Sequence, residues 1–140
     1  MGRRARAAQA GGMHNNRPTQ VFIVDDSTAI RTRLVEMLTA LEDVRVVGEA
    51  ANARDAIASI LQLKPDSVLL DLNLYGRTGL EVLKTVHAQA PEIIFIVLTN
   101  HAEIQYRRAC SAAGASYFLD KTCEFERVAE VIAEIASTRH

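Results

Sequence analysis

The chain has 140 residues, of which 49% are hydrophobic and 24% charged, and its formal net charge is −1. This composition is typical of one globular domain, so there is no room for a second catalytic domain, and no apolar run is long enough to cross a bilayer. A charge so close to zero also excludes the overall basic field that attracts nucleic acid.

The first 19 residues differ from the rest of the chain. Four arginines occur there without any acid, and Gly11-Gly12 and Asn15-Asn16 interrupt any helix. No apolar segment follows the first arginines, so a secretory signal is not expected. We predict a basic, disordered tail over 1–19 and one folded domain over 20–138.

Strand-like and helix-like segments alternate after this tail. The runs 21–24, 68–70 and 93–98 are apolar at every position, which is typical of parallel strands covered on both faces. The runs 44–49 and 116–119 alternate in polarity or are short, which favours edge positions. The strand order 2-1-3-4-5 has these edges, so we predict an α/β, doubly wound, flavodoxin-like fold with a five-stranded parallel sheet and five helices.

The helices are predicted from apolar periodicity and from polar residues at their starts. Apolar residues recur at helical spacing in 27–41 and 124–136. Three further starts have a polar cap followed three residues later by an acid. The caps are Asn52, Thr78 and Asn100, and the acids are Asp55, Glu81 and Glu103.

The role of Asn100 and the packing of the fourth helix need further consideration. Asn100 either caps the fourth helix or stands beside the site described next, where its side chain could slow the entry of water. The fourth helix has few large apolar residues and contains Tyr106, Arg107 and Arg108, so we expect it to be weakly anchored and able to shift.

Side chains that can bind a ligand or take part in a reaction stand at the ends of four of the apolar runs. Asp25 and Asp26 follow the first run, and Asp71 follows the third. Thr99 closes the fourth run, and Lys121 follows the fifth. The carboxyl ends of parallel strands meet at one edge of the sheet, and ligands bind at the switch point between strands one and three. We therefore expect these five side chains to lie together.

Three carboxylates in one crevice need a compensating cation, because each pair repels by roughly 3–4 kcal/mol at an intermediate dielectric. Oxygen donors without sulfur or imidazole favour a hard ion, and Mg²⁺ suits a site that leaves positions for water and phosphate. A hydroxyl at Thr99 and an ammonium at Lys121 favour phosphoryl chemistry, with Asp71 as the nucleophile and with Asp25 and Asp26 as metal ligands. Each aspartate alone could be a helix cap, but their coincidence at the strand ends favours a site.

Several motifs accompany these residues. They are Val24-Asp25-Asp26-Ser27, Asp71-Leu72-Asn73 with Gly79 eight residues after the aspartate, Thr99, and Ala113-Gly114-Ala115 leading to Phe118 and Lys121. Together they resemble the receiver domain of two-component response regulators, over residues 20–137.

The resemblance implies that Asp71 accepts a phosphoryl group from the phosphohistidine of a sensor histidine kinase or phosphotransfer protein. It implies that Asp26, Asp71 and the backbone carbonyl of Asn73 bind Mg²⁺ directly, and that Asp25 assists through water. It also implies that Thr99 moves toward the phosphoryl oxygens and that Lys121 pairs with them. Phe118 matches the aromatic position of the switch.

The output expected of such a protein is a contact with another protein. The resemblance places it on the face formed by helix four, strand five and helix five, with a downstream target that the sequence does not identify or with a phosphorylation-dependent homodimer. The chain ends after the fifth helix, so we expect a stand-alone receiver that binds neither DNA nor membranes and has no enzymatic activity beyond its own phosphorylation and dephosphorylation.

Two alternatives remain open. One is a Mg²⁺-dependent phosphatase that acts through an aspartyl phosphate, although Asn73 stands where such enzymes usually place an acid. The other is a pseudo-receiver that only binds proteins. Cys110 and Cys123 have no CxxC spacing and the four histidines form no ligand pair, so we expect reduced thiols in a cytoplasmic protein and no transition-metal site.

Overall fold

The main sheet of the protein is parallel and five-stranded. The computed structural model describes residues 17–74, 77–100 and 103–139. The sheet has the strand order β2-β1-β3-β6-β7. Counting only these strands along the chain, the order is 2-1-3-4-5, which confirms the predicted flavodoxin-like α/β fold. The strands are β1 (Thr19–Val24), β2 (Val44–Ala50), β3 (Ser67–Leu70), β6 (Ile94–Thr99) and β7 (Tyr117–Asp120).

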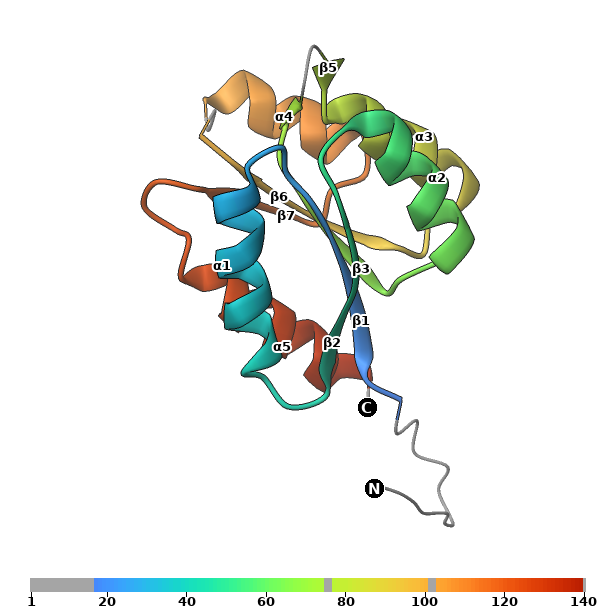
Figure 1. The fold of residues 1–140 in the computed structure, drawn as a ribbon. Helices are drawn as coiled ribbons and strands as arrows, with labels where there is room; N and C mark the ends of the chain where they lie inside the picture. Colours follow the sequence, from blue (N-terminus) through green and yellow to red (C-terminus); the bar gives the residue numbers. More distant parts are fainter. Residues whose placement is uncertain (1–16, 75–76, 101–102, 140) are drawn as a thin grey trace.

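Five helices, counted within the described ranges, connect the strands and cover both faces of the sheet. In Figure 1, α1 and α5 lie on one face, whereas α2, α3 and α4 lie on the other. None of the helices described is long and apolar enough to span a membrane. The helices are α1 (Thr28–Thr39), α2 (Ala53–Leu63), α3 (Leu80–Gln89), α4 (Ile104–Ala112) and α5 (Arg127–Arg139).

The central strands are buried on both faces because their side chains alternate between two cores. In β1, Val21 and Ile23 pack with residues of α1 and α5, whereas Phe22 and Val24 pack with residues of α2 and α3. All four side chains are at most 1% exposed. The same alternation holds in β3 and β6. The prediction that the first, third and fourth long strands are central, and the second and fifth are edges, is confirmed.

A short hairpin after β3 was not predicted. It consists of β4 (Asn73–Leu74) and β5 (Arg77–Thr78), which pair in the antiparallel direction. Strands of two residues are too short to produce a period in the sequence. Because Thr78 belongs to this hairpin, α3 begins only at Leu80, with Gly79 in the cap position. The predicted cap at Thr78 is therefore wrong.

The other predicted caps had different outcomes. The Asn52 side chain accepts a hydrogen bond from the backbone N–H of Asp55 at 2.8 Å, so this cap is confirmed. The cap at Asn100 is wrong, because α4 begins at Ile104 and Glu103 takes the cap position. The hydroxyl of Thr122 donates instead to Oδ1 of Asn100 at 3.4 Å.

The start of the last helix also differs from the predicted segment 124–136, since α5 begins at Arg127. The carboxylate of Glu124 accepts a hydrogen bond from the backbone N–H of Asp120 at 2.9 Å. The backbone N–H of Glu124 donates back to the Asp120 carbonyl at 2.7 Å. These bonds hold a turn at the point where the periodicity predicts helix.

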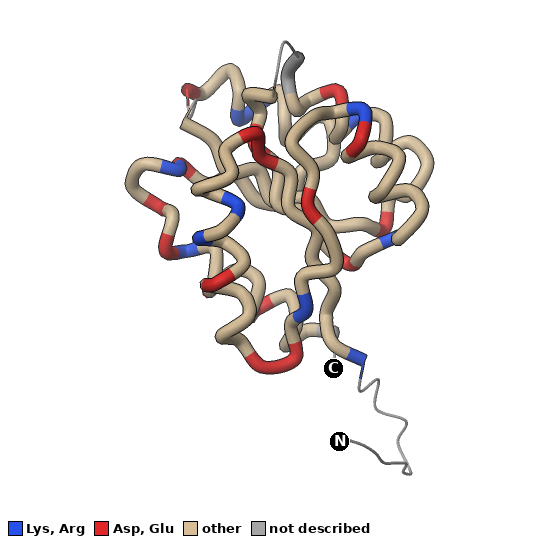
Figure 2. Tube along the Cα trace, viewed as in Figure 1, with Lys and Arg blue, Asp and Glu red and all other residues tan. Residues whose placement is uncertain are grey.

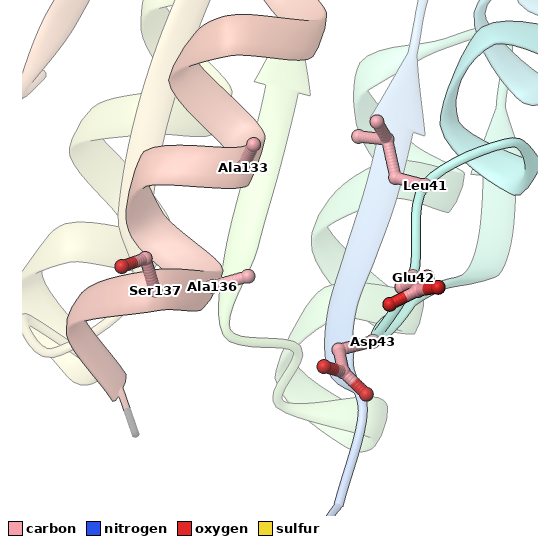
Figure 3. Close-up of a pocket in the computed structure, with 6 residues that line it drawn as sticks. All are labelled: Leu41, Glu42, Asp43, Ala133, Ala136 and Ser137. Atoms are coloured by element: carbon pink, nitrogen blue, oxygen red, sulfur yellow. The ribbon is translucent and has the colours of Figure 1, made fainter.

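The amino ends of the strands form the opposite edge of the domain. There the loop after α1 faces the second half of α5 across a groove of about 220 Å³ (Figure 3). The Asp43 carbonyl accepts from the backbone N–H of Thr19 at 2.7 Å, which ties this loop to the start of β1. Of the predicted tail 1–19, residues 1–16 lie outside the described part. The groove is lined by Leu41, Glu42, Asp43, Ala133, Ala136 and Ser137.

The cap at Asn52 leads to a prediction about stability. Replacement by alanine leaves the Asp55 N–H without its side-chain acceptor, so we expect Asn52→Ala to reduce the free energy of unfolding by about 1 kcal/mol. Asn52→Ser keeps a hydroxyl acceptor and should lose less than half of that. Urea denaturation followed by far-UV circular dichroism measures both, and equal losses in the two variants would contradict the capping role.

Candidate functional site

The structure brings the five predicted site residues to one edge of the sheet. Asp25 and Asp26 follow β1, and Asp71 follows β3, its direct neighbour, with Val24 paired to Leu70. One carboxylate oxygen of each aspartate lies within 4.8 Å of the other two. Figure 2 shows the acidic positions at the end of β1, at the edge where α1 begins.

Asp25 is buried, and its backbone N–H and both of its carboxylate oxygens form hydrogen bonds. It is 2% exposed. Its backbone N–H donates to the carbonyl of Ala50 at 3.1 Å, which ties it to the end of β2. Its Oδ1 accepts from the backbone N–H of Ser27 at 2.9 Å, and its Oδ2 accepts from Nζ of Lys121 at 2.8 Å. These contacts fix the carboxylate and satisfy both of its oxygens.

Asp71 is also buried, at 5% exposure. Its backbone N–H donates to the carbonyl of Val24 at 2.9 Å, which continues the pairing of β1 with β3. Its Oδ1 accepts from the backbone N–H of Asn73 at 3.2 Å, and its Oδ2 accepts from Nζ of Lys121 at 3.2 Å. Asp26 is less buried than these two carboxylates, so it lies toward the solvent side of the cluster.

Lys121 bridges the two buried carboxylates. Its side chain is 10% exposed, and its ammonium contacts Asp25 and Asp71 together. Its backbone N–H donates to the carbonyl of Thr99 at 2.8 Å, so the end of β6 determines where the lysine enters the site. Thr99 itself is fully buried at the end of β6.

Burial and charge act on the ionisation of this cluster in opposite directions. Burial raises the pKa of Asp71, the charge of Lys121 lowers it and the charge of Asp25 raises it, so that the pKa lies above its ordinary value. Burial lowers the pKa of Lys121, but its hydrogen bond to Asp25 and the charges of both carboxylates raise it further, so that it lies above its ordinary value. The lysine is therefore charged at neutral pH, and a further cation would relieve the remaining repulsion.

The donor set fits Mg²⁺. Three carboxylates within 4.8 Å of one another provide only oxygen ligands, and the partly exposed side of Asp26 leaves room for water. No histidine or cysteine belongs to this cluster. The predicted fourth ligand, the carbonyl of Asn73, stands two residues after Asp71 in β4, and it stays a prediction.

A glycine is required next to Asp71. The backbone N–H of Gly79 donates to the carbonyl of Leu72, and a Cβ at Gly79 would overlap the carbonyl oxygen of Asp71. Any side chain at this position must therefore move the backbone that carries Asp71. The sequence resemblance included Gly79, but the reason for it, a close backbone approach, lies in the tertiary structure.

The sequence did not indicate Arg31 or the role of Arg107 beside the switch aromatic. Arg31 of α1 donates to the backbone carbonyl of Asp25 at 2.6 Å. Arg107 of α4 places its guanidinium 4.7 Å from the centroid of the Phe118 ring and donates to the Phe118 carbonyl at 3.3 Å. Each of these helices contains a second arginine, Arg33 or Arg108, so composition could not distinguish the arginine that makes these contacts.

The fold and the acidic cluster define a flavodoxin-like domain with a metal-compatible site at its switch point. Residues 21–133 match the family model of the response regulator receiver domain. The chain therefore belongs to this family, whose members are the phosphoacceptors of two-component systems and bind Mg²⁺ at an acidic pocket. The predicted resemblance is confirmed.

Individual relatives agree with this assignment. The chain is 31% identical over 116 residues to the response regulator GacA of Pseudomonas aeruginosa, covering 83% of this chain and 54% of that protein. It is 34% identical over 116 residues to the response regulator VraR of Staphylococcus saprophyticus, covering 82% and 55%. The chain thus spans about half the length of the curated relatives it matches.

A solved structure with a similar fold is the response regulator domain of Thermotoga maritima CheB. It aligns with a TM-score of 0.78 and 27% identity, covering 88% of this chain and 97% of that structure.

The close approach at Gly79 gives a prediction. Gly79→Ala should displace the Asp71 backbone, weaken Mg²⁺ binding by about tenfold or more and lower the free energy of unfolding by about 2 kcal/mol. Gly114→Ala is the matched control, because Gly114 has φ +112° and its Cβ would contact the His87 ring at 2.7 Å. The control should lose stability but keep Mg²⁺ affinity, as measured by isothermal titration calorimetry. Equal Mg²⁺ affinity in both variants would contradict this account.

The raised pKa of Asp71 gives a second prediction. The folded protein holds this proton more tightly than the unfolded chain, so the contribution of Asp71 to stability is full below the ordinary pKa of 3.8 and is lost as pH rises through the folded value. Without metal at pH 7, Asp71→Asn should therefore raise the free energy of unfolding by on the order of 1 kcal/mol, and the gain should shrink near pH 4.

The same variant responds differently to metal. Mg²⁺ at ten times its Kd should stabilise the wild type by about 1.4 kcal/mol and Asp71→Asn much less. Thermal unfolding in EDTA and in Mg²⁺ at both pH values measures these differences. A loss of stability in the variant at pH 7 without metal would show that the Lys121 pairing outweighs the burial of the charge.

Proposed function

We propose that this chain is a phosphoacceptor whose Asp71 takes a phosphoryl group from the phosphohistidine of a sensor histidine kinase or phosphotransfer protein. The observation that carries the proposal is the joint position of three carboxylates within 4.8 Å of one another and of Lys121 between Asp25 and Asp71. A buried nucleophile with a fixed cation beside it is suited to phosphoryl transfer, in which positioning and charge neutralisation dominate.

The transfer requires one bond exchange. An oxygen of the Asp71 carboxylate bonds to phosphorus while the phosphorus–nitrogen bond of the donor breaks. The imidazole nitrogen keeps the electron pair and takes up a proton. The product is an aspartyl phosphate on this chain and a neutral histidine on the donor.

The residues around Asp71 have separate roles in this reaction. Asp26, Asp71 and the Asn73 carbonyl would hold Mg²⁺ directly and Asp25 would hold it through water, and the ion would supply positive charge against the carboxylates and the phosphoryl oxygens. Lys121 already contacts Asp71 Oδ2 at 3.2 Å, so its ammonium is in place to pair with a phosphoryl oxygen. Thr99, at the end of the neighbouring strand, supplies a hydroxyl donor to the same group.

The output surface that we propose consists of α4, β7 and α5. Cys110 is the buried residue of α4, and Ile104 in its first turn is 63% exposed, so this helix is held by few contacts. Arg107 joins α4 to the switch aromatic Phe118 and lies 3.8 Å from Glu124, ahead of α5. The doubly charged phosphoryl group on Asp71 attracts Thr99 and Lys121. Because α4 is loosely packed, this attraction can change the relative populations of two conformations of α4.

The downstream partner is a protein that binds this surface, or a second copy of the chain in a phosphorylation-dependent homodimer. One relative is the DNA-binding transcriptional activator DevR/DosR of Mycobacterium tuberculosis, 28% identical over 120 residues, or 55% of that protein. The name of this relative describes the whole protein, of which the match covers 55%, so its DNA binding is not assigned to this chain. Action of this receiver without an output domain, and without direct contact to nucleic acid, stays a prediction.

Phosphorylation by a small donor tests the proposal. Incubation with acetyl phosphate and Mg²⁺ should add one phosphoryl group to the wild type, detected by intact-mass spectrometry, and none to Asp71→Asn. Asp43→Asn is the matched control, since it removes an aspartate at the opposite edge of the sheet and should be phosphorylated as well as the wild type.

Two results would contradict the proposal. Wild-type protein that acquires no phosphoryl group from acetyl phosphate or from a phosphohistidine donor would favour a binding module that does not use phosphorylation. Rapid, continuous release of phosphate from small phosphate esters would favour a phosphatase, although Asn73 provides no acid to protonate a leaving group.

A further inference from the structure

Arg31 connects α1 to the loop that carries Asp25 and Asp26. Three nitrogens of its guanidinium donate to three different groups. Nη1 donates to the carbonyl oxygen of Asp25 at 2.6 Å, and Nε donates to Oε1 of Glu49 at 3.1 Å. Nη2 donates to Oγ1 of Thr28 at 3.2 Å. The planar guanidinium can hold three acceptors at once, which a lysine cannot do in the same geometry.

The contact with the Asp25 carbonyl completes the restraint of this residue. The backbone N–H and both carboxylate oxygens of Asp25 already have partners in Ala50, Ser27 and Lys121. Arg31 adds the carbonyl, which belongs to the peptide unit between Asp25 and Asp26. The orientation of this peptide unit determines the direction in which the Asp26 side chain leaves the backbone.

Glu49 in turn restrains Arg31. The Arg31 side chain is 16% exposed, and the Glu49 side chain in edge strand β2 is 42% exposed. The glutamate balances the charge of the arginine. By accepting from Nε, it leaves the two terminal nitrogens of the guanidinium directed toward the loop that carries Asp25 and Asp26. The chain of contacts therefore runs from β2 through Arg31 to the peptide unit ahead of Asp26.

We propose that Arg31 is a positioning residue for the metal site, holding the Asp25–Asp26 peptide unit so that both carboxylates face Asp71. This inference rests on the proposed function, because it concerns Mg²⁺ at the same three aspartates. Arg31 touches neither the metal nor the phosphoryl group. Groups that orient metal ligands in this indirect way commonly change metal affinity by 10- to 100-fold.

A purely electrostatic role for Arg31 makes the opposite prediction. A cation near three carboxylates repels Mg²⁺, so its removal would tighten Mg²⁺ binding if charge alone mattered. A positioning role predicts weaker binding on removal. The sign of the change in affinity therefore separates the two roles.

The experiment compares four variants with the wild type. Arg31→Met removes both the fork and the charge, whereas Arg31→Lys keeps the charge and loses the fork. Glu49→Ala removes the partner of Arg31 at an exposed position. Arg33→Met is the matched control: it removes the same charge from the same helix, where Arg33 stacks 4.2 Å from the centroid of the Phe125 ring, away from the site.

Three measurements are made on the full chain. They are the Mg²⁺ Kd by calorimetry, the hydrogen exchange of the Ser27 amide, which donates to Asp25, without metal, and the Mg²⁺ dependence of phosphorylation by acetyl phosphate. We expect Arg31→Met to weaken Mg²⁺ binding about tenfold and Arg31→Lys to weaken it severalfold, with faster amide exchange in both. The Mg²⁺ concentration for half-maximal phosphorylation should rise while the plateau rate is kept. Glu49→Ala should show a smaller change of the same sign, and Arg33→Met none.

The possible results distinguish this inference from the proposed function. Wild-type Mg²⁺ affinity and amide exchange in Arg31→Met, or tighter Mg²⁺ binding, would overturn the positioning role and leave the proposed function standing. If Arg31→Met does not fold, Arg31→Lys and Glu49→Ala decide the question by the same criteria. A wild type that binds no Mg²⁺ would overturn the proposed function and this inference together.

Discussion

The repulsion among Asp25, Asp26 and Asp71 is the constraint on which the rest of the structure depends. Two of these carboxylates are nearly inaccessible to water, so the fold must supply their counter-charge. Lys121 supplies it from the far strand by bridging Asp25 and Asp71. The ion pairs therefore link the end of the first strand to the end of the last strand. A change in charge at Asp71 changes the electrostatic energy of Lys121, which directly follows β7.

The parallel sheet makes this arrangement possible. Every crossover returns the chain to the same edge, so strands far apart in sequence deliver their terminal residues to one crevice. Precision comes from contacts behind the crevice. Gly79 allows the backbone of Asp71 to approach closely, and Arg31 holds the carbonyl of Asp25. The cluster of three carboxylates is thus supported by Gly79 and Arg31, which contribute no carboxylate to it.

The periphery of the domain has the opposite character. The central strands are buried on both faces, whereas α4 has one buried residue, Cys110, and exposes Ile104. The proposed switch uses both properties, because tight packing keeps the charge at Asp71 in one place and loose packing lets α4 change its position at a small cost in free energy. Arg107 of α4 contacts the ring and the carbonyl of Phe118 in β7, the strand that precedes Lys121.

The sequence by itself determined the strand order, the edge positions and the placement of Asp25, Asp26, Asp71, Thr99 and Lys121 at one edge of the sheet. Buried parallel strands are apolar at every position, and these five residues stand at or just after the carboxyl ends of such strands. It also predicted the cap at Asn52, which depends on contacts within four residues. Only the tertiary structure decided the hairpin that replaces the cap at Thr78, the later start of α4 and the contact of Arg31 with Asp25. These features depend on contacts between residues that come together only in the folded chain, and the local periodicity of the sequence does not predict such contacts.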